Sequence, residues 1–203
     1  MSLDGTTTGL KAAIASWLKR SDLTSVMDDL ITLAEERIST DLLLRTQLVE
    51  GTLTTAAGVQ EVILPTGLIE IENMSIASPV RQLTYVNIEH LDSKYPSDVT
   101  GLPAVFTIEG NEIYFGPSPD AVYTVNILYY QKFPSLLTNT TNTLLTTFPS
   151  IYLWACLAES APFTMDDSRT ALFESKYQTA VSKATIRDDA AVHSGSALRV
   201  RRI

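Results

Sequence analysis

The apolar residues of this chain change their spacing twice, and that change most limits what the chain can fold into. They recur every three or four residues up to about residue 44, every second residue between 47 and 133, and every three or four again further on. The wider spacing is typical of amphipathic helices, and alternation is typical of half-buried strands. The order therefore predicts an α+β fold, with antiparallel helices from both ends of the chain packing into one bundle and an antiparallel β-rich region inserted between them.

Four helices are expected, two from each end of the chain. The first follows capping candidates at Thr6 to Thr8, and the second should span residues 22–44, about 33 Å at 1.5 Å per residue. A third should begin at Pro149 and end at Pro162, and a fourth should begin at Asp166. Their apolar stripes, in chain order, are Leu10, Ile14, Trp17 and Leu18; Leu23, Val26, Met27, Leu30, Leu33, Ala34, Ile38 and Leu42; Ile151, Tyr152, Trp154, Ala155, Leu157 and Ala158; and Leu172, Phe173, Tyr177, Ala180, Val181 and Ala184.

The inserted region contains a β-hairpin with a two-residue turn. Gly110 and Asn111 separate the alternating segments TIE and EIYF, and glycine suits the mirror-image turns that match the twist of paired strands. A third strand follows the break GPSPD, and its apolar face consists of Tyr123, Val125, Ile127 and Tyr129. The pattern predicts an antiparallel meander with one buried face.

Further strands are expected before this hairpin. Residues 52–54 should turn at Ala57-Gly58 and run back through 59–63. The other expected elements are strands at 68–71, 74–76 and 81–85 and a helical turn at 87–95 that Pro96 ends. The chain is thus expected to divide into N-terminal helices at 1–46, a β-rich insertion at 47–133, C-terminal helices at 134–186 and an extended C-terminal tail at 187–203.

Composition is that of a folded protein outside membranes. Of the 203 residues, 45% are hydrophobic and only 9 each are Gly and Pro, so one compact body or a core with an insertion is expected, the single body being the simpler. The single Cys156 lies in the run IYLWACLAES and is expected to act as a small buried hydrophobe. The apolar run at 148–163 is shorter than the about 20 residues of a membrane span, and the N-terminal segment has no secretory pattern.

The net charge of −8 limits the partners of the chain. The terminal segment LRVRRI holds three of the 15 basic residues, so the remainder is more acidic still. Duplex binding requires clustered Lys and Arg that displace counterions, and the body of the chain has no such cluster. Direct nucleic-acid binding is therefore disfavoured, whereas an acidic surface would repel a polyanion passing close by.

Residues able to carry chemistry are scattered. His90 and His193 have no second His, Cys or spaced carboxylates nearby, so neither predicts a metal site. The pairs Asp28-Asp29, Asp166-Asp167 and Asp188-Asp189 consist of neighbours that point about 100° apart on a helix, so helix capping or solvation explains them better than catalysis. Phosphate-binding, nucleophile-elbow and Ca²⁺-loop motifs are absent from the sequence. No catalytic residue, cofactor or metal is therefore predicted.

Three blocks of sequence together resemble the phage adaptor protein family, the head-to-tail connector subunits of tailed bacteriophages. They are SWLKRSDLTSVMDDLITLAEERISTDLL, then FTIEGNEIYFGPSPDAVYTVNILYYQKFPSL, then NTLLTTFPSIYLWACLAESAPFTMDDSRTALFESKYQTAV, which includes the characteristic element LAESAPFTMDDSR. The resemblance covers roughly residues 8–185 in the family's order, and leaves out the first residues and the tail.

The resemblance implies a structural function without an active site. Members of the family form a ring, typically twelvefold, that docks beneath the portal in the neck of the virion and carries tail or nozzle proteins. DNA is then only cargo in the channel, no membrane is involved, and the chain would be made in the host bacterial cytoplasm. A C-terminal extension commonly engages the portal, and an acidic channel lining suits a genome that must slide.

Two sets of residues are candidates for assembly contacts. The portal-binding candidates are Leu198, Arg199, Val200, Arg201, Arg202 and Ile203, and the subunit-interface candidates are Tyr114, Tyr129, Tyr130 and Phe133. The tail has two interpretations: a frayed, solvated end, or a segment that orders on a partner by strand addition or in an acidic groove. Two other functions stay open, a different virion component such as a tail-tube or head-completion subunit, and a small hydrolase whose carboxylates meet only in three dimensions.

Overall fold

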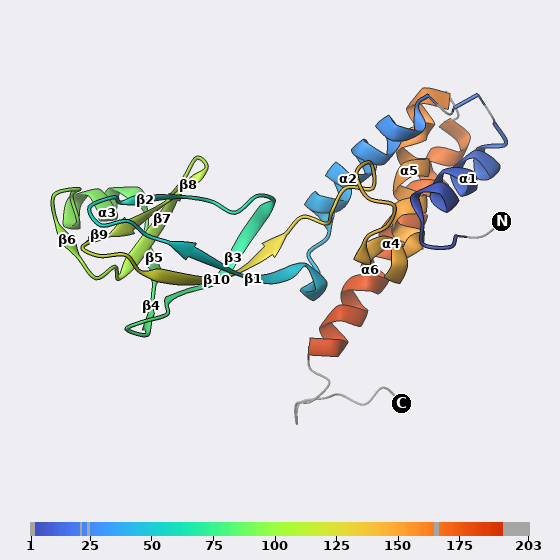
Figure 1. Cartoon of the computed structure of the whole chain (residues 1–203). Coiled ribbons are helices and arrows are strands. Elements are labelled where there is room, and N and C mark those ends of the chain that lie inside the picture. The colour runs from blue at the N-terminus through green and yellow to red at the C-terminus, as the bar shows by residue number, and fades with distance from the viewer. Residues whose placement is uncertain (1–2, 21, 24, 165–166, 193–203) are drawn as a thin grey trace. The chain divides into compact units, whose positions relative to one another are not determined.

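The computed structural model describes residues 3–20, 22–23, 25–164 and 167–192, which form two compact units (Figure 1). Each unit has an apolar core of its own. The β unit is the segment Gln47–Lys132, and the helical unit comprises the described residues up to Thr46 and from Phe133 onward. N-terminal helices pack against C-terminal helices, and an antiparallel β region is inserted between them, which confirms the predicted α+β class. The expectation of one compact body was wrong, because the strands bury a core of their own.

The helical unit is arranged around α5, which packs against each of the other four helices. Side chains from all five helices meet in one core, and Ile14, Tyr152 and Tyr177 within it are fully buried. The helices are α1 (Thr7–Leu18), α2 (Met27–Asp41), α4 (Thr143–Thr147), α5 (Pro149–Thr164) and α6 (Asp167–Val192).

Helix boundaries differ from the predicted ones where turns or buried side chains intervene. The second helix is 15 residues long, not 23, because a turn at Leu23 precedes it and the extended backbone of Leu42 ends it. Pro162 lies inside α5 rather than at its end, since a proline in the last turn removes only one backbone donor. The last helix continues to Val192, beyond the residue 186 expected for the end of the bundle.

Three residues of the predicted apolar stripes are exposed. Trp17 is 43% exposed, and its ring makes an edge contact with Trp154, 5.1 Å between ring centroids. Leu33 and Leu172 are 46% and 49% exposed, although the residues beside them in each stripe are buried. The apolar surface of α1, α2 and α6 is thus wider than the core requires, and part of it stays accessible in the single chain.

The sequence analysis did not predict the short helix α4. Asn142 caps α4, since its Oδ1 accepts a hydrogen bond from the backbone N–H of Leu145 at 2.8 Å. Its Nδ2 donates to the hydroxyl of Tyr152 on α5 at 2.7 Å and to the carbonyl of Pro134 at 2.9 Å. The asparagine therefore fixes the segment that returns from the β unit onto α5, and burial raises the pKa of Tyr152.

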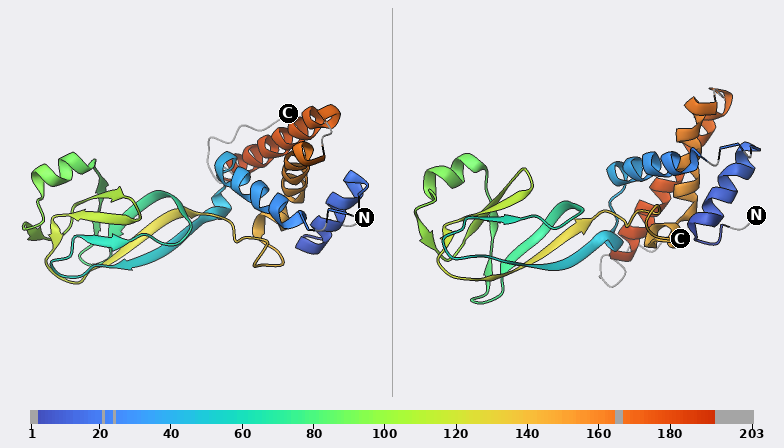
Figure 2. Two further views of the ribbon diagram at one scale, coloured as in Figure 1. Left: turned by 90° about the horizontal axis from the view of Figure 1, so that it is seen from above. Right: turned by 45° about the horizontal axis from the view of Figure 1, so that its top comes forward.

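The β unit contains two four-stranded sheets, in the orders β1-β10-β3-β4 and β2-β8-β7-β5, and a two-stranded pair β6-β9. Most pairings are antiparallel, and β5-β7 and β6-β9 are parallel. Figure 2 shows β1, β10 and β3 side by side. The strands are β1 (Leu48–Thr54), β2 (Glu61–Ile63), β3 (Leu68–Ile76), β4 (Arg81–Gln82), β5 (Thr84–Tyr85), β6 (Thr100–Gly101), β7 (Val105–Glu109), β8 (Glu112–Gly116), β9 (Ser118–Pro119) and β10 (Thr124–Gln131), with α3 (Ile88–Lys94) after β5 and a 3₁₀ turn (Arg45–Gln47) before β1.

Turns were predicted better than strand partners. The hairpin β7-β8 turns at Gly110, whose φ is 60°, as expected. However, β10 pairs with β1 and β3 rather than with β8, so the predicted meander is wrong. The expected hairpin around Gly58 is also wrong, because only the isolated bridge Ala56–Val59 joins its arms, and β1 and β2 belong to different sheets. A turn is encoded locally, whereas the partner of each strand depends on which apolar faces pack together.

The predicted break between residues 71 and 74 is a change of register within one strand. Leu128 pairs with Asn73 and Tyr129 pairs with Ile71, so Glu72 is skipped and β3 bulges there. The bulge keeps the buried side chains of β10 aligned with those of β3 on either side of it. The expected strand at 81–85 is likewise divided into β4, which pairs with β3, and β5, which pairs with β7 in the other sheet, and Leu83 between them is buried.

Candidate functional site

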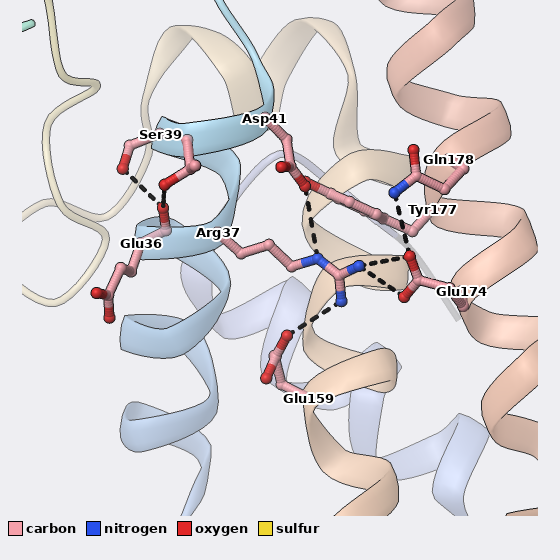
Figure 3. A network of polar contacts seen from close by, with 9 residues as sticks. Glu36, Arg37, Ser39, Asp41, Glu159, Glu174, Tyr177 and Gln178 are labelled. Carbon is pink, nitrogen blue, oxygen red and sulfur yellow. Dashed lines mark hydrogen bonds and ion pairs between the residues drawn. The ribbon is translucent and has the colours of Figure 1, made fainter.

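A cluster of charged side chains joins three helices of the helical unit (Figure 3). Arg37 on α2 donates from Nη1 to Oε1 of Glu159 on α5 at 3.1 Å, and from Nη2 to both carboxylate oxygens of Glu174 on α6 at 2.5 and 2.6 Å. Its Nε lies 3.6 Å from Oδ2 of Asp41, and its guanidinium lies over the ring of Tyr177, 4.4 Å from the centroid. The arginine thus ties α2, α5 and α6 together.

The electrostatics of this cluster favour a fixed charge state. Partial burial acts to raise the pKa of Glu174, but hydrogen bonds from Arg37 and Gln178 outweigh it and hold the pKa below its ordinary value. Burial acts to lower the pKa of Arg37, and the hydrogen bond and charge of Glu174 reverse this, so that pKa is raised. Burial, and then the hydrogen bond that Tyr177 donates to Asp41, raise the pKa of the phenol. The cluster therefore holds three helices together through ion pairs and hydrogen bonds.

Sequence reasoning missed this cluster, although two signals for it were present. Arg37 and Asp41 are four residues apart, which places them on one side of a helix. Glu159 is the only charged residue in the apolar segment 148–163, and a carboxylate in such a setting needs a cation. What no local pattern shows is that Arg37 meets Glu159 and Glu174, which lie 122 and 137 residues from it in the sequence.

The titratable residues singled out in the sequence occupy dispersed positions. His90 is exposed in the first turn of α3, where its backbone N–H donates to the Asn87 cap, and His193 lies outside the described residues. Asp28 forms an ion pair with Lys11 at 2.5 Å. In the part of the chain that the structure describes, no three His, Cys, Asp or Glu side chains are grouped as metal ligands.

The other aspartate pairs are equally separate. Asp188 accepts a hydrogen bond from the backbone N–H of Arg45 at 2.7 Å, with the guanidinium 4.0 Å away, whereas Asp189 is exposed. Asp166 lies outside the described residues, and α6 begins at Asp167. Cys156 is fully buried, and burial raises the pKa of its thiol, which confirms that it acts as a small core residue.

A shallow depression of about 570 Å³ lies on the outer face of the sheet β1-β10-β3. Its polar lining consists of one carboxylate and neutral hydroxyl and amide groups, which supplies hydrogen bonds but no nucleophile paired with a base. The lining residues are Glu50, Gly51, Thr52, Asn73, Ser75, Asn126, Ile127 and Leu128. Over the described residues, none of the helices combines the length and apolarity needed to cross a bilayer.

Charge is divided unequally between the two units. The segment 47–132 contains three Lys and Arg against ten Asp and Glu, a net charge of −7, whereas the rest of the chain contains twelve against thirteen, a net charge of −1. The ion pairs among described residues lie in the helical unit, and the fully described β unit has none. The β unit therefore presents most of the unneutralised negative charge.

The candidate interface residues fall into different environments. Tyr129 is only 6% exposed and belongs to the β-unit core, so it offers almost no surface to a neighbouring subunit. Phe133 is half-buried against the helical core. Tyr114 and Tyr130 are half-buried on strands β8 and β10. The portal-binding candidates from Leu198 to Ile203 lie outside the described residues.

Comparison with models of known protein families gives a match over nearly the whole chain. The curated proteins contain no match to this chain. A family model described as SU10 adaptor protein matches residues 6–201, and so includes most of the tail that the resemblance in the sequence had left out. An adaptor family of this kind implies binding to other virion proteins and no catalysis. The chain therefore belongs to the SU10 adaptor protein family.

Proposed function

We propose that the chain is the head-to-tail connector subunit of a tailed bacteriophage, and that twelve copies form a ring on the portal. The ring would carry tail or nozzle proteins in the virion neck, and the genome would pass through it. The match to an adaptor family over residues 6–201 is the observation that carries the proposal. The two-unit architecture supports it, because separate cores let one subunit contact its ring neighbours and a third protein through different surfaces.

The C-terminal segment from Leu198 to Ile203 is proposed as the portal anchor. It contains three arginines and no Asp or Glu, whereas residues 1–197 contain twelve Lys and Arg against 23 Asp and Glu, a net charge of −11. Arginine forms bidentate hydrogen bonds with carboxylates, so such a segment suits an acidic surface on another protein. The family match extends to residue 201 and thus includes most of this segment.

The acidity of the β unit fits a protein beside a moving genome. A net charge of −7 over residues 47–132 gives DNA no adhesive surface there. The half-buried Tyr114 and Tyr130 of the same unit remain proposed for contacts between subunits.

The test is the mass of the purified chain by light scattering, alone and mixed with the portal protein of the same genome. We expect the portal ring to gain the mass of one chain per portal subunit. A chain that leaves the portal unchanged would refute the portal docking. If it then polymerised into stacked rings by itself, a tail-tube function would replace the connector function.

A truncation locates the anchor. Deleting residues 194–203 should abolish portal binding while leaving the far-ultraviolet circular dichroism unchanged. A matched variant that keeps the length but reverses the charge of Arg199, Arg201 and Arg202 to Glu should also fail to bind, because the proposed contact is electrostatic. Retained binding by either variant would contradict the proposed anchor without affecting the family assignment.

A further inference from the structure

One side of α6 is exposed along about four turns and carries both cations and apolar groups. The buried side faces the core through Phe173, Tyr177 and Val181. The exposed side repeats at three- and four-residue intervals, and its two apolar members, Leu172 and Ile186, are 49% and 50% exposed. We call it the α6 outer stripe; it consists of Leu172, Lys176, Thr179, Lys183 and Ile186, and it is about 21 Å long at 1.5 Å per residue.

The lysines of the α6 outer stripe lack a counter-ion within the described part of the chain. Glu174 on the same helix is bound by Arg37, and Asp188 is bound by Arg45. Neither Lys176 nor Lys183 forms an ion pair with any residue that the structure describes. Exposed cations beside exposed leucine and isoleucine are typical of a surface that binds an acidic and partly apolar partner.

A surface of that kind lies on the sheet β2-β8-β7 of the β unit. In this sheet Glu61 pairs with Tyr114, Ile63 pairs with Glu112, and Glu112 pairs with Glu109. Directly paired residues and residues two apart on a strand point to the same side, so the five share one face. Ile63 is 67% exposed at the sheet edge. We call this set of five residues the acidic face.

The acidic face contains an unfavourable contact that its own unit does not relieve. Glu109 and Glu112 are directly opposite each other across the hairpin, and like charges in such a pair are destabilising. The fully described β unit supplies no ion pair to either. Tyr114 donates a hydrogen bond to Glu112 at 3.1 Å, which, with the nearby carboxylates, raises the pKa of the phenol. A local conflict that a fold retains commonly marks a functional surface.

We propose that the α6 outer stripe of one copy docks on the acidic face of the next copy. Lys176 and Lys183 are about 10.5 Å apart along the helix, and the three strands of the acidic face span about 10 Å, so both lysines can reach carboxylates at once. Whichever of Leu172 and Ile186 lies over the edge strand β2 would cover the exposed Ile63. This deepens the proposed function and rests on it, since it assigns the contact between neighbouring subunits of the ring.

The partner is another copy because both halves of the contact are on one chain. Two different surfaces that fit each other make a head-to-tail interface, which closes into a ring when the rotation per subunit divides a full turn. Each copy then docks its α6 outer stripe on one neighbour and binds the stripe of its other neighbour on its own acidic face. Opposite charge on the two surfaces also prevents stripe-to-stripe and face-to-face pairing, because like charges would meet.

Charge reversal and mixing test this arrangement. The stripe variant carries Lys176→Glu and Lys183→Glu, and the face variant carries Glu61→Lys and Glu112→Lys. Self-association of the parent, alone and on the portal ring, is measured by sedimentation velocity. We expect each variant alone to associate at least tenfold more weakly than the parent. An equimolar mixture should recover association, because alternating copies in a ring restore both complementary contacts.

A matched control and a cross-link make the test specific. Glu70→Lys with Glu72→Lys reverses the same charge on exposed positions of β3 and should leave association unchanged. Thr179→Cys and Tyr114→Cys chains should form a disulfide only when mixed, because native Cys156 is fully buried. Circular dichroism checks that each variant is folded.

Each outcome separates the two proposals. Rings that form but are unaffected by the reversals, or are not rescued by mixing, overturn the docking arrangement and leave the proposed function intact. A parent chain that remains monomeric both alone and beside the portal overturns both. If the parent chain bound a short duplex DNA and the stripe variant did not, while both self-associated equally, the α6 outer stripe would be a nucleic-acid surface. That result would also overturn the docking.

Discussion

The helical unit and the β unit use their charges in opposite ways. In the helical unit, twelve cations and thirteen anions nearly balance, and carboxylates such as Glu159, Glu174 and Asp188 are held by arginines of the same unit. In the β unit, ten anions face three cations and no ion pair forms among its residues, all of which are described. One unit therefore uses charge to hold itself together, and the other presents charge to its surroundings.

The difference shows which forces stabilise each unit. The β unit must rely on its apolar core, because its electrostatic self-interaction is repulsive. The helical unit has an apolar core and, in addition, the cluster of Arg37 with Glu159 and Glu174, which joins three helices and is called the clamp below. Substitutions in the two units should consequently differ in kind as well as in size.

The largest effect is expected from the β-unit core. Phe115 on β8 is fully buried, so Phe115→Ala should destabilise the β unit by about 4 kcal/mol through lost burial and the cavity left behind. Hydrogen exchange of the backbone amides of β7 and β8 would measure it locally. Val122→Ala, at a position 67% exposed in the same unit, should change the exchange free energy by less than about 0.5 kcal/mol. Equal effects of the two substitutions would contradict the assignment of this core.

Removal of the clamp should affect the helical unit. The side chain of Arg37 is 24% exposed and that of Glu159 is 27% exposed, so Arg37→Met should destabilise the unit by about 2 kcal/mol, between the values for exposed and buried pairs. Tryptophan fluorescence during urea unfolding reports this unit, because both tryptophans, Trp17 and Trp154, lie in it. Glu36→Gln on the same helix is the control and should leave the free energy of unfolding nearly unchanged. A similar loss of stability there would show that the clamp contributes no more than an ordinary surface charge.

The smallest effect is a pH dependence of the same clamp. The folded pKa of Glu174 lies below its ordinary value, so its contribution is present above about pH 4.5 and is lost as the pH falls through the folded pKa. With 42% of the side chain exposed, solvent screening keeps this contribution below about 1 kcal/mol. Glu174→Gln should therefore remove part of the decrease in fluorescence-detected stability between pH 5 and 3. An unchanged pH profile would contradict the ion pair.

Local features of the fold were predictable because they depend on neighbouring residues. Thr6 caps α1 and Asn87 caps α3 through hydrogen bonds over three residues, and Gly110 permits the positive φ of the hairpin turn. The tail from Leu198 to Ile203 was singled out from sequence, and its contact with the portal stays a prediction.

The candidate surfaces needed more than local patterns. Alternation alone could place Glu109 and Glu112 on one side of a hairpin, but only the pairing of β2 with β8 brings Glu61 and Ile63 beside them. The exposure of Leu172 could not be read from the sequence, since its spacing is that of a core residue. It depends on how far the neighbouring helices extend over α6.

The sequence by itself determined the order of helices and strands, the turns and caps, the acidic balance and the membership of an adaptor family, because each depends on local spacing or on composition. The tertiary structure alone decided that β10 lies between β1 and β3, and that Arg37 meets carboxylates 122 and 137 residues away. Such partners are selected by the joint burial of apolar faces that are distant in the chain. No local pattern encodes that choice, because every strand with one apolar face has several neighbours that could cover it.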